Sequence, residues 1–304
     1  MRFMMMGAGG VGGYFGARLA QAGFEVGFVA RGEHLKAIQN NGLKVLSPQG
    51  DMALPKVQVA ADPGQLGPTD VIFVAVKLTD MAAALTALAP AVGPETLVIS
   101  LQNGVEAEDL LANAFGPGHV AAGIAYIAAV VEAPGVIRHI GTNQRIQLGA
   151  LSVNPGAPVG DIVHNLVIAG IDAEVPDDMT FALWQKFVFL VGLAATTTVT
   201  GKPIGEIRTD AHSRRFLFDV MSEAAAVGRA RGVPLPGDFA ETRLAFADSL
   251  PEAMTSSMAH DRAAGKALEL AWLSGAVVRF GQEAGVPTPV NNAVVAALTL
   301  GAGD

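Results

Sequence analysis

The N-terminal twenty residues constrain the fold more than any other part of the chain. An apolar run, residues 3–6, leads directly into a glycine-rich segment: Gly7, Ala8, Gly9, Gly10, Val11 and Gly12. Residues 13–20 then have the composition of a helix. A strand, a glycine turn and a helix in this order form the context of the dinucleotide-binding fingerprint G-x-G-x-x-G. The sequence therefore predicts a β-α-β unit at the N-terminus.

Each of the three fingerprint positions requires glycine for a different physical reason. Gly7 permits the tight turn, Gly9 lets the backbone approach a pyrophosphate, and Gly12 lets the helix pack on the strand. The free N–H groups at the start of the helix, together with its dipole, suit an anion. The alternative is a glycine turn that serves packing only. The place of the motif, at the opening of a β-α-β pattern, favours dinucleotide binding.

Composition narrows the class of protein. A chain of 304 residues predicts two domains, and 51% hydrophobic with 16% charged residues indicates a globular protein. A net charge of −8 without a basic run argues against nucleic acid or an anionic membrane as partner. The absence of cysteine excludes disulfides and thiolate chemistry, and the histidines show no metal-binding spacing. The longest uncharged apolar stretches, residues 120–131 and 187–199, are shorter than a membrane span. We expect a soluble cytoplasmic protein without a metal.

The end of the second predicted strand, residues 24–30, bears on the choice of cofactor. In NAD-binding proteins an acidic residue there binds the ribose 2′-hydroxyl. This chain has Arg31 at that place and no carboxylate. A guanidinium pairs well with a 2′-phosphate, so the sequence favours NADP(H) over NAD(H). Glu33 keeps open the alternative that Arg31 is an exposed loop charge.

Two further apolar runs, residues 70–76 and 96–101, are typical of strands buried on both faces. Lys77 follows the first run and Asn103 follows the second. Ligands of open α/β sheets bind beyond the carboxyl ends of the strands. One polar residue at such an end is usually only solvated. The glycine segment, Arg31, Lys77 and Asn103 together favour a single site.

The remaining pattern predicts more elements in both halves of the chain. Strands are expected at residues 43–46, 57–60, 120–131, 135–140, 144–149 and 171–176, and helices at 82–88, 179–200, 216–231 and 266–279. The fold class is thus α/β, a Rossmann-type doubly wound sheet followed by a helical domain. We place an NADP-binding domain at residues 1–174 and a helical substrate and catalytic domain at 175–304.

One lysine stands out in the expected helix at residues 179–200. The helix is apolar almost all round, so it should be buried. Lys186 lies within it, between Trp184 and Phe187. A buried ammonium is costly unless it is paired or functional, and burial lowers its pKa. Lys186 is then either a lysine that extends its ammonium to solvent or a general acid.

A carboxylate stands out in the expected helix at residues 266–279, the last long helix. Glu269 shares an apolar face with Trp272, Leu273 and Ala276 in that helix. A carboxylate on such a face needs a partner. An intrahelical pair with Lys266, one turn earlier, is the simplest one.

Together these segments resemble the ketopantoate reductase (2-dehydropantoate 2-reductase) family along nearly the whole chain. The resemblance rests on the glycine segment, Arg31, V-K at 76–77, Q-N-G-V at 102–105, W-Q-K-F at 184–187, S-S-M at 256–258 and E-L-A-W-L-S-G-A-V-V-R at 269–279. It implies a Rossmann domain and an all-helical domain similar to the C-terminal domain of 6-phosphogluconate dehydrogenase. NADPH and substrate would bind between them.

The resemblance also implies roles for individual residues. Lys186 corresponds to the catalytic lysine, which donates a proton and contacts the substrate. Lys77 and Asn103 correspond to residues on the cofactor side, with Asn103 also near the substrate. Glu269 would contact the nicotinamide ribose, and Ser257 would hold the substrate carboxylate. The activity implied is the NADPH-dependent reduction of ketopantoate to pantoate in pantothenate biosynthesis, with a homodimer left open.

The chain departs from the family pattern at one place. The pattern has asparagines four and eight residues after the lysine, at the hydroxyl end of the substrate, and here these are Leu190 and Ala194. Thr197, on the same helix face, is a candidate to supply a hydroxyl instead. The departure leaves two alternatives to ketopantoate reduction open. One is a reductase of a less polar 2-oxo acid, and the other is a non-catalytic NADPH-binding sensor.

Overall fold

The computed structural model describes residues 1–151, 154 and 156–299. The chain divides into two compact units, Met1–Met179 and Thr180–Asp304. The first unit is built on a mixed sheet and the second on helices, which confirms the predicted fold class. The domain boundary predicted between residues 174 and 175 stays a prediction; it lies shortly before this division.

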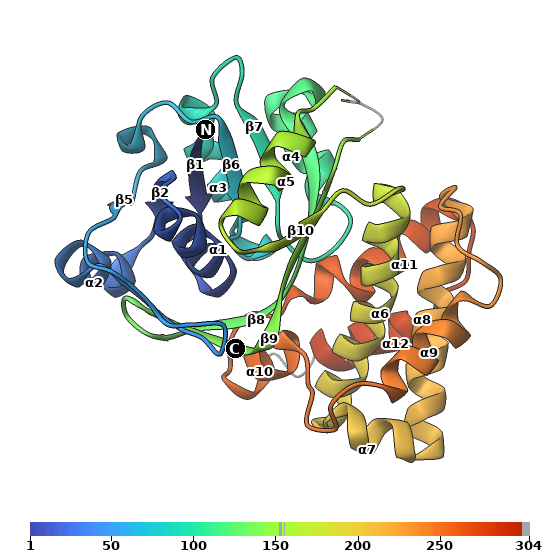
Figure 1. The fold of residues 1–304 in the computed structure, drawn as a ribbon. Helices are drawn as coiled ribbons and strands as arrows, with labels where there is room; N and C mark the ends of the chain where they lie inside the picture. The colour runs from blue at the N-terminus through green and yellow to red at the C-terminus, as the bar shows by residue number, and fades with distance from the viewer. Residues whose placement is uncertain (152–153, 155, 300–304) are drawn as a thin grey trace. The chain divides into compact units, whose positions relative to one another are not determined.

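A ten-stranded sheet forms the centre of the N-terminal unit (Figure 1). Its strands are β1 (Arg2–Met6), β2 (Glu25–Val29), β3 (Leu43–Leu46), β4 (Met52–Leu54), β5 (Gln58–Ala60), β6 (Val71–Val74), β7 (Leu97–Ser100), β8 (Val120–Ala133), β9 (Val136–Gly149) and β10 (Asp172–Glu174). The strand order is β4-β3-β9-β8-β7-β6-β1-β2-β5, and β10 pairs with β9. The run from β5 to β7 is parallel and has the strand order of a Rossmann sheet.

Strand β1 shows why the central strands read as continuous apolar runs. Phe3 and Met5 join one core cluster, which includes Phe15 of the first helix. Met4 and Met6 join a second cluster on the other face of the sheet. Successive side chains of a strand point to opposite faces, so a strand covered on both faces must be apolar throughout.

The helices of this unit are α1 (Gly10–Gln21), α2 (Gly32–Asn41), α3 (Met81–Leu88), α4 (Ala107–Phe115) and α5 (Val159–Ile168). Short 3₁₀ turns are η1 (Pro63–Leu66), η2 (Leu78–Asp80), η3 (Ala89–Ala91) and η4 (Pro117–His119). Tyr14, Phe15 and Leu19 of α1 pack into the first core cluster. Met81 and Leu88 of α3 pack into the second.

The long hairpin of β8 and β9 replaces three predicted strands with two. Ile127 pairs with Gln144 and the next residue, Ala128, pairs with Ile140. Residues 141–143 are therefore left out of the ladder as a bulge, which explains the gap in the apolar pattern there. Strand β4 is an addition to the predicted strands.

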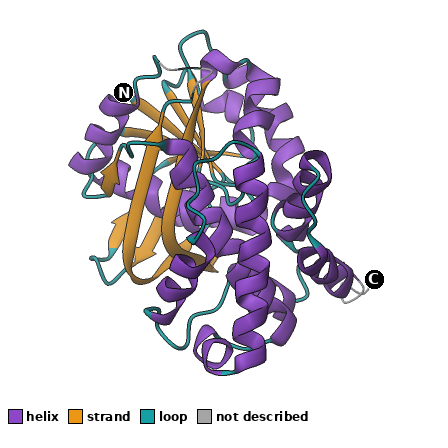
Figure 2. Cartoon of the chain, turned by 90° about the vertical axis from the view of Figure 1, so that its right-hand side faces the viewer, coloured by secondary structure: helices purple, strands orange, loops and turns teal. Residues whose placement is uncertain are grey.

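The C-terminal unit consists of helices and loops in its described residues (Figure 2). Its elements are α6 (Met179–Thr200), α7 (Ile204–Thr209), α8 (Ala211–Ala230), α9 (Phe239–Asp248), α10 (Ser257–Ala263), η5 (Glu269–Trp272), α11 (Ser274–Ala284) and α12 (Pro289–Thr299). The helix predicted at residues 179–200 is confirmed. Helices α7, α9, α10 and α12 were not predicted. At the start of α12, the backbone N–H groups of Val290 and Asn291 donate hydrogen bonds to the Glu223 carboxylate of α8.

The prediction of a single helix over residues 266–279 is wrong. Glu269 lies in the 3₁₀ turn η5, and α11 begins only at Ser274. Leu273 between them has φ −109° and ψ −104°, which is outside the helical region. A Cβ at Gly275 would lie 3.0 Å from the carbonyl oxygen of Leu270, so α11 starts in close packing against the turn. The one-turn spacing from Lys266 to Glu269 therefore does not apply.

Among the described residues, one helix, α6, is long and apolar enough to cross a membrane. Its most apolar window has a mean hydropathy of 1.4, and 61% of that window is buried inside the fold. Such burial is the pattern of a core helix. The predicted apolar stretch was shorter because it stopped at Lys186, whereas the apolar character continues on both sides of that residue.

Candidate active site

The glycine segment joins β1 to α1, and its backbone has the predicted geometry. Gly7 has φ +105°, which L side chains rarely adopt. A Cβ at Gly12 would lie 2.1 Å from the carbonyl oxygen of Gly7, so the helix could not pack here with any side chain. A Cβ at Gly9 would meet no atom within 4 Å. Gly9 therefore borders open space, whereas Gly7 and Gly12 are fixed by the protein's own backbone.

The structure also explains why position 10 is glycine, which the sequence did not predict. A Cβ there would lie 2.0 Å from the carbonyl oxygen of Ala129 in β8. The start of α1 thus packs directly on the backbone of the long hairpin. The contact joins residues far apart in sequence, so no local pattern could have revealed it.

The segment fits a dinucleotide. The space beside Gly9 is the cradle that a Cβ would fill, and it lies where α1 begins. Gly9 caps α1 without a side-chain hydrogen bond, and the first turn carries no acidic residue. The N–H groups of that turn can therefore bind an anion.

Arg31 lies at the end of β2 as predicted, and it is exposed at the N-cap of α2. Glu33, which had left its role open, forms an ion pair with Lys36, at 2.7 Å between Nζ and the carboxylate. Arg31 follows the strand next to the one that leads into the glycine segment, since β2 neighbours β1. This placement agrees with the predicted contact to a 2′-phosphate but does not test it.

Lys77 and Asn103 follow β6 and β7, the next strands on the other side of β1. Lys77 is exposed and Asn103 is half-buried. Gln102 ties their two loops together, because its side-chain amide donates to the carbonyl oxygen of Val76 at 2.9 Å. The four predicted features of the N-terminal unit thus occupy the carboxyl ends of four adjacent strands. No separate role is predicted for Gln102 from the sequence, where it stands only as part of the Q-N-G-V motif.

Lys186 occupies the N-terminal half of α6 and is half-buried, less than the sequence suggested. Trp184 and Phe187 beside it are 6% and 1% exposed. Leu190, one turn further, is half-buried, whereas Ala194 is 1% exposed. Of the two positions that carry asparagines in the family pattern, only Leu190 has accessible surface to offer a ligand.

Thr197 is fully buried, and its hydroxyl is engaged inside the C-terminal unit. Its Oγ1 donates to the carbonyl oxygen of Leu193 at 2.6 Å and lies 2.8 Å from Oγ of Ser256. A hydroxyl has one proton, so Ser256 must be the donor between the two. These contacts do not favour the predicted role of Thr197 in substrate binding, which stays a prediction.

Ser257 is the exposed first residue of α10. Ser256 before it is the N-cap, and its Oγ accepts from the N–H of Ala259 at 3.1 Å. Through the contact between Ser256 and Thr197, the start of α10 is fixed to the C-terminal part of α6. Glu269 is half-buried in η5, and its predicted contact with the nicotinamide ribose is likewise untested.

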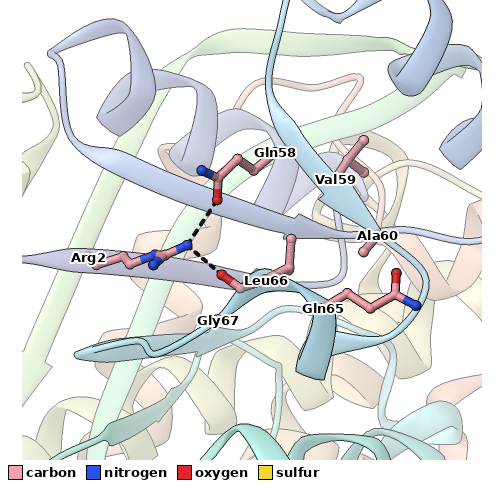
Figure 3. A pocket seen from close by; sticks show the side chains of 7 residues that line it. All are labelled: Arg2, Gln58, Val59, Ala60, Gln65, Leu66 and Gly67. Carbon is pink, nitrogen blue, oxygen red and sulfur yellow. Dashed lines mark hydrogen bonds between the residues drawn. The ribbon is translucent and has the colours of Figure 1, made fainter.

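A pocket of about 450 Å³ lies elsewhere in the N-terminal unit (Figure 3). It is lined by Arg2, Gln58, Val59, Ala60, Gln65, Leu66 and Gly67. The Arg2 guanidinium is engaged there, because it donates to the Gln58 side chain at 3.1 Å and to the Leu66 carbonyl oxygen at 2.5 Å. None of the predicted site residues lines this pocket, so we do not assign the activity to it.

Comparison with known proteins identifies the family. The model of the ketopantoate reductase PanE/ApbA family matches residues 3–152, and that of the ketopantoate reductase PanE/ApbA C terminal matches residues 178–301. The chain is 33% identical to the 2-dehydropantoate 2-reductase of Mesorhizobium japonicum, covering 97% of this chain and 96% of the relative. It is 29% identical to the 2-dehydropantoate 2-reductase of Nostoc, covering 96% and 92%.

Comparison with solved structures gives the same family. A PanE/ApbA family ketopantoate reductase from Ralstonia eutropha has a TM-score of 0.90 and 35% identity, covering 99% of this chain and 98% of that one. A 2-dehydropantoate 2-reductase from Geobacter metallireducens has a TM-score of 0.92 at 29% identity, covering 99% of both chains. The resemblance suggested by the sequence motifs is thus confirmed over both units, and the chain belongs to the ketopantoate reductase family.

Proposed function

We propose that this protein is an NADPH-dependent 2-dehydropantoate 2-reductase, which reduces ketopantoate to pantoate. The observation that carries the proposal is the agreement along nearly the whole chain with relatives of that name at 29–33% identity. The glycine segment and Arg31 supply a fitting cofactor site. Lys186 supplies a protonated amine of the type that the reaction needs.

In the proposed reaction each residue has a limited task. The N–H groups around Gly9 bind the pyrophosphate, and Arg31 binds the 2′-phosphate. NADPH, when bound, supplies a hydride for the keto carbon. The Lys186 ammonium donates a proton to the oxygen of the same carbonyl as negative charge develops on it. Ser257 holds the substrate carboxylate, and Asn103, Lys77 and Glu269 complete the contacts.

The geometry adds one specific feature to this proposal. The side of α6 that carries Lys186 presents Leu190 where the family pattern has an asparagine, and the next such position, Ala194, is buried. The hydroxyl end of ketopantoate therefore meets an apolar side chain in this chain. A homodimer in the cytoplasm, without nucleic acid or membrane as partner, remains the prediction for its assembly and location.

A direct assay tests the function. Purified protein is mixed with NADPH and a panel of 2-oxo acids, and the nicotinamide absorbance is followed. We expect turnover with ketopantoate and slower turnover with NADH in place of NADPH. No turnover of any 2-oxo acid, in a protein that still binds NADPH, would contradict the proposal and favour a non-catalytic role.

A further inference from the structure

One histidine connects three segments around the glycine loop. His34 lies in the first turn of α2 and is half-buried. Its Nε2 lies 2.8 Å from the carbonyl oxygen of Ala8, inside the glycine segment. Its Nδ1 accepts a hydrogen bond of 3.0 Å from the backbone N–H of Gly135, in the turn between β8 and β9. The family motifs quoted above do not include this residue.

The two backbone partners fix the protonation state of the ring. A backbone N–H can only donate, so Nδ1 must be the unprotonated nitrogen. A carbonyl oxygen can only accept, so Nε2 must carry the proton. His34 therefore acts as a neutral ring with one donor and one acceptor, each used on a backbone group whose role cannot reverse.

The contact with Ala8 orients the next peptide group. Ala8 is 2% exposed, and its own N–H donates to the carbonyl oxygen of Val29 at 2.8 Å. The peptide between Ala8 and Gly9 is trans, so its C=O and N–H point in opposite directions. Because His34 holds the C=O, the Gly9 N–H must point to the opposite side.

We propose that His34 is a positioning residue for the cofactor, which holds the Gly9 N–H in the direction that binds the pyrophosphate. This inference rests on the proposed function, because it assigns the pyrophosphate to the glycine segment. His34 does not touch the cofactor in this proposal. It removes the freedom of one peptide group that would otherwise have to be ordered when the dinucleotide binds.

Two substitutions separate the two hydrogen bonds. His34→Gln places an amide donor near the position of Nε2 and can keep the bond to Ala8. His34→Asn reaches only the position of Nδ1, so it can keep the bond to Gly135 but loses the one to Ala8. His164→Gln, at an exposed position of α5, serves as the control for replacing a histidine by an amide.

The measurement is the dissociation constant for NADPH and for NADH, with the melting temperature of each variant. We expect His34→Asn to weaken both cofactors by the same factor, about three- to tenfold for one net hydrogen bond, and His34→Gln to stay within about twofold of the native protein. Equal factors are expected because the pyrophosphate is common to both cofactors. The control should change neither constant.

Other outcomes would overturn the inference. Equal affinities of the Asn and Gln variants, or a loss for NADPH alone, would show that the bond to Ala8 does not act through the pyrophosphate. A loss of affinity that only follows the melting temperature would show a general structural role. Failure of the native protein to bind NADPH would instead contradict the proposed function. Nitrogen NMR of the native protein should find the proton on Nε2 of His34.

Discussion

The glycine segment and helix α6 use different parts of the chain for their proposed roles. In the glycine segment the backbone is proposed to bind the cofactor, and four positions lack a side chain: Gly7, Gly9, Gly10 and Gly12. In α6 a single charged side chain, Lys186, stands in an otherwise apolar helix. Part of the geometry of such a backbone site is local, and the sequence encodes that part directly. A side-chain site depends on which neighbours the tertiary fold brings to it.

The largest expected effect tests the side-chain half of this comparison. Lys186→Ala should lower kcat by about 10²- to 10⁴-fold, the usual range for a general acid, with the affinity for NADPH unchanged. Lys202→Ala, which removes an exposed lysine paired with Glu206, is the matched control and should keep full activity. Normal turnover of Lys186→Ala would leave Lys186 as a lysine that merely extends its ammonium to solvent.

The next effect concerns a side chain that works beside the backbone site. Arg31→Ala should weaken NADPH by about 1–3 kcal/mol, the range for a lost charge-assisted contact, and leave NADH nearly unchanged. Lys36→Ala on the same helix is the control for a lost positive charge. Equal affinity of the native protein for the two cofactors would contradict the role of Arg31.

Two glycine substitutions test the proposed backbone site and separate cofactor binding from helix packing. Gly9→Ala should keep the melting temperature, because its Cβ would meet no atom within 4 Å, yet weaken NADPH by about tenfold by filling the space for the pyrophosphate. Gly12→Ala should lower the melting temperature, because its Cβ would lie 2.1 Å from the Gly7 carbonyl oxygen. Native affinity in Gly9→Ala would mean that the cofactor does not approach this backbone.

The glycine segment was predictable to the extent that its constraints are local. A positive φ at Gly7 and the approach of Gly12 to Gly7 involve residues close in sequence, and the motif records both. The contact of Gly10 with Ala129 and the contacts of His34 with Ala8 and Gly135 are long-range. Nothing in the nearby sequence indicates them; strand β8 and helix α1 were predicted, but helix α2, which carries His34, was not.

In the C-terminal unit, the extent of one helix could be predicted from the sequence, but a helix break and a buried contact could not. The extent of α6 followed from its composition, but the break between η5 and α11 did not follow from the apolar period of residues 266–279. The pair Ser274-Gly275 was the available signal, because glycine is unfavourable inside a helix. The burial of Thr197 against Ser256 was also hidden, since a threonine on a helix face gives no sign of what packs on that face.

The smallest expected effect concerns substrate choice and tests whether α6 can recognise a hydroxyl. A site built to hydrogen-bond a hydroxyl strongly rejects substrates that lack it, whereas an apolar wall discriminates by about 1–3 kcal/mol per methylene. Since Leu190 is apolar and the Thr197 hydroxyl is engaged with Leu193 and Ser256, we expect 2-oxoisovalerate to be reduced within about a hundredfold of ketopantoate in kcat/KM.

Two variants show which residue of α6 determines whether substrates without the hydroxyl are accepted. Leu190→Asn should raise the preference for ketopantoate by about three- to tenfold, the value of one net hydrogen bond, at little cost in stability because Leu190 is half-buried. Thr197→Val should leave the preference unchanged, because its hydroxyl already serves the contact between α6 and α10. The measurement is the ratio of kcat/KM for the two acids in each variant. A native preference above about 10⁴-fold that disappears in Thr197→Val would show that Thr197 binds the substrate hydroxyl after all.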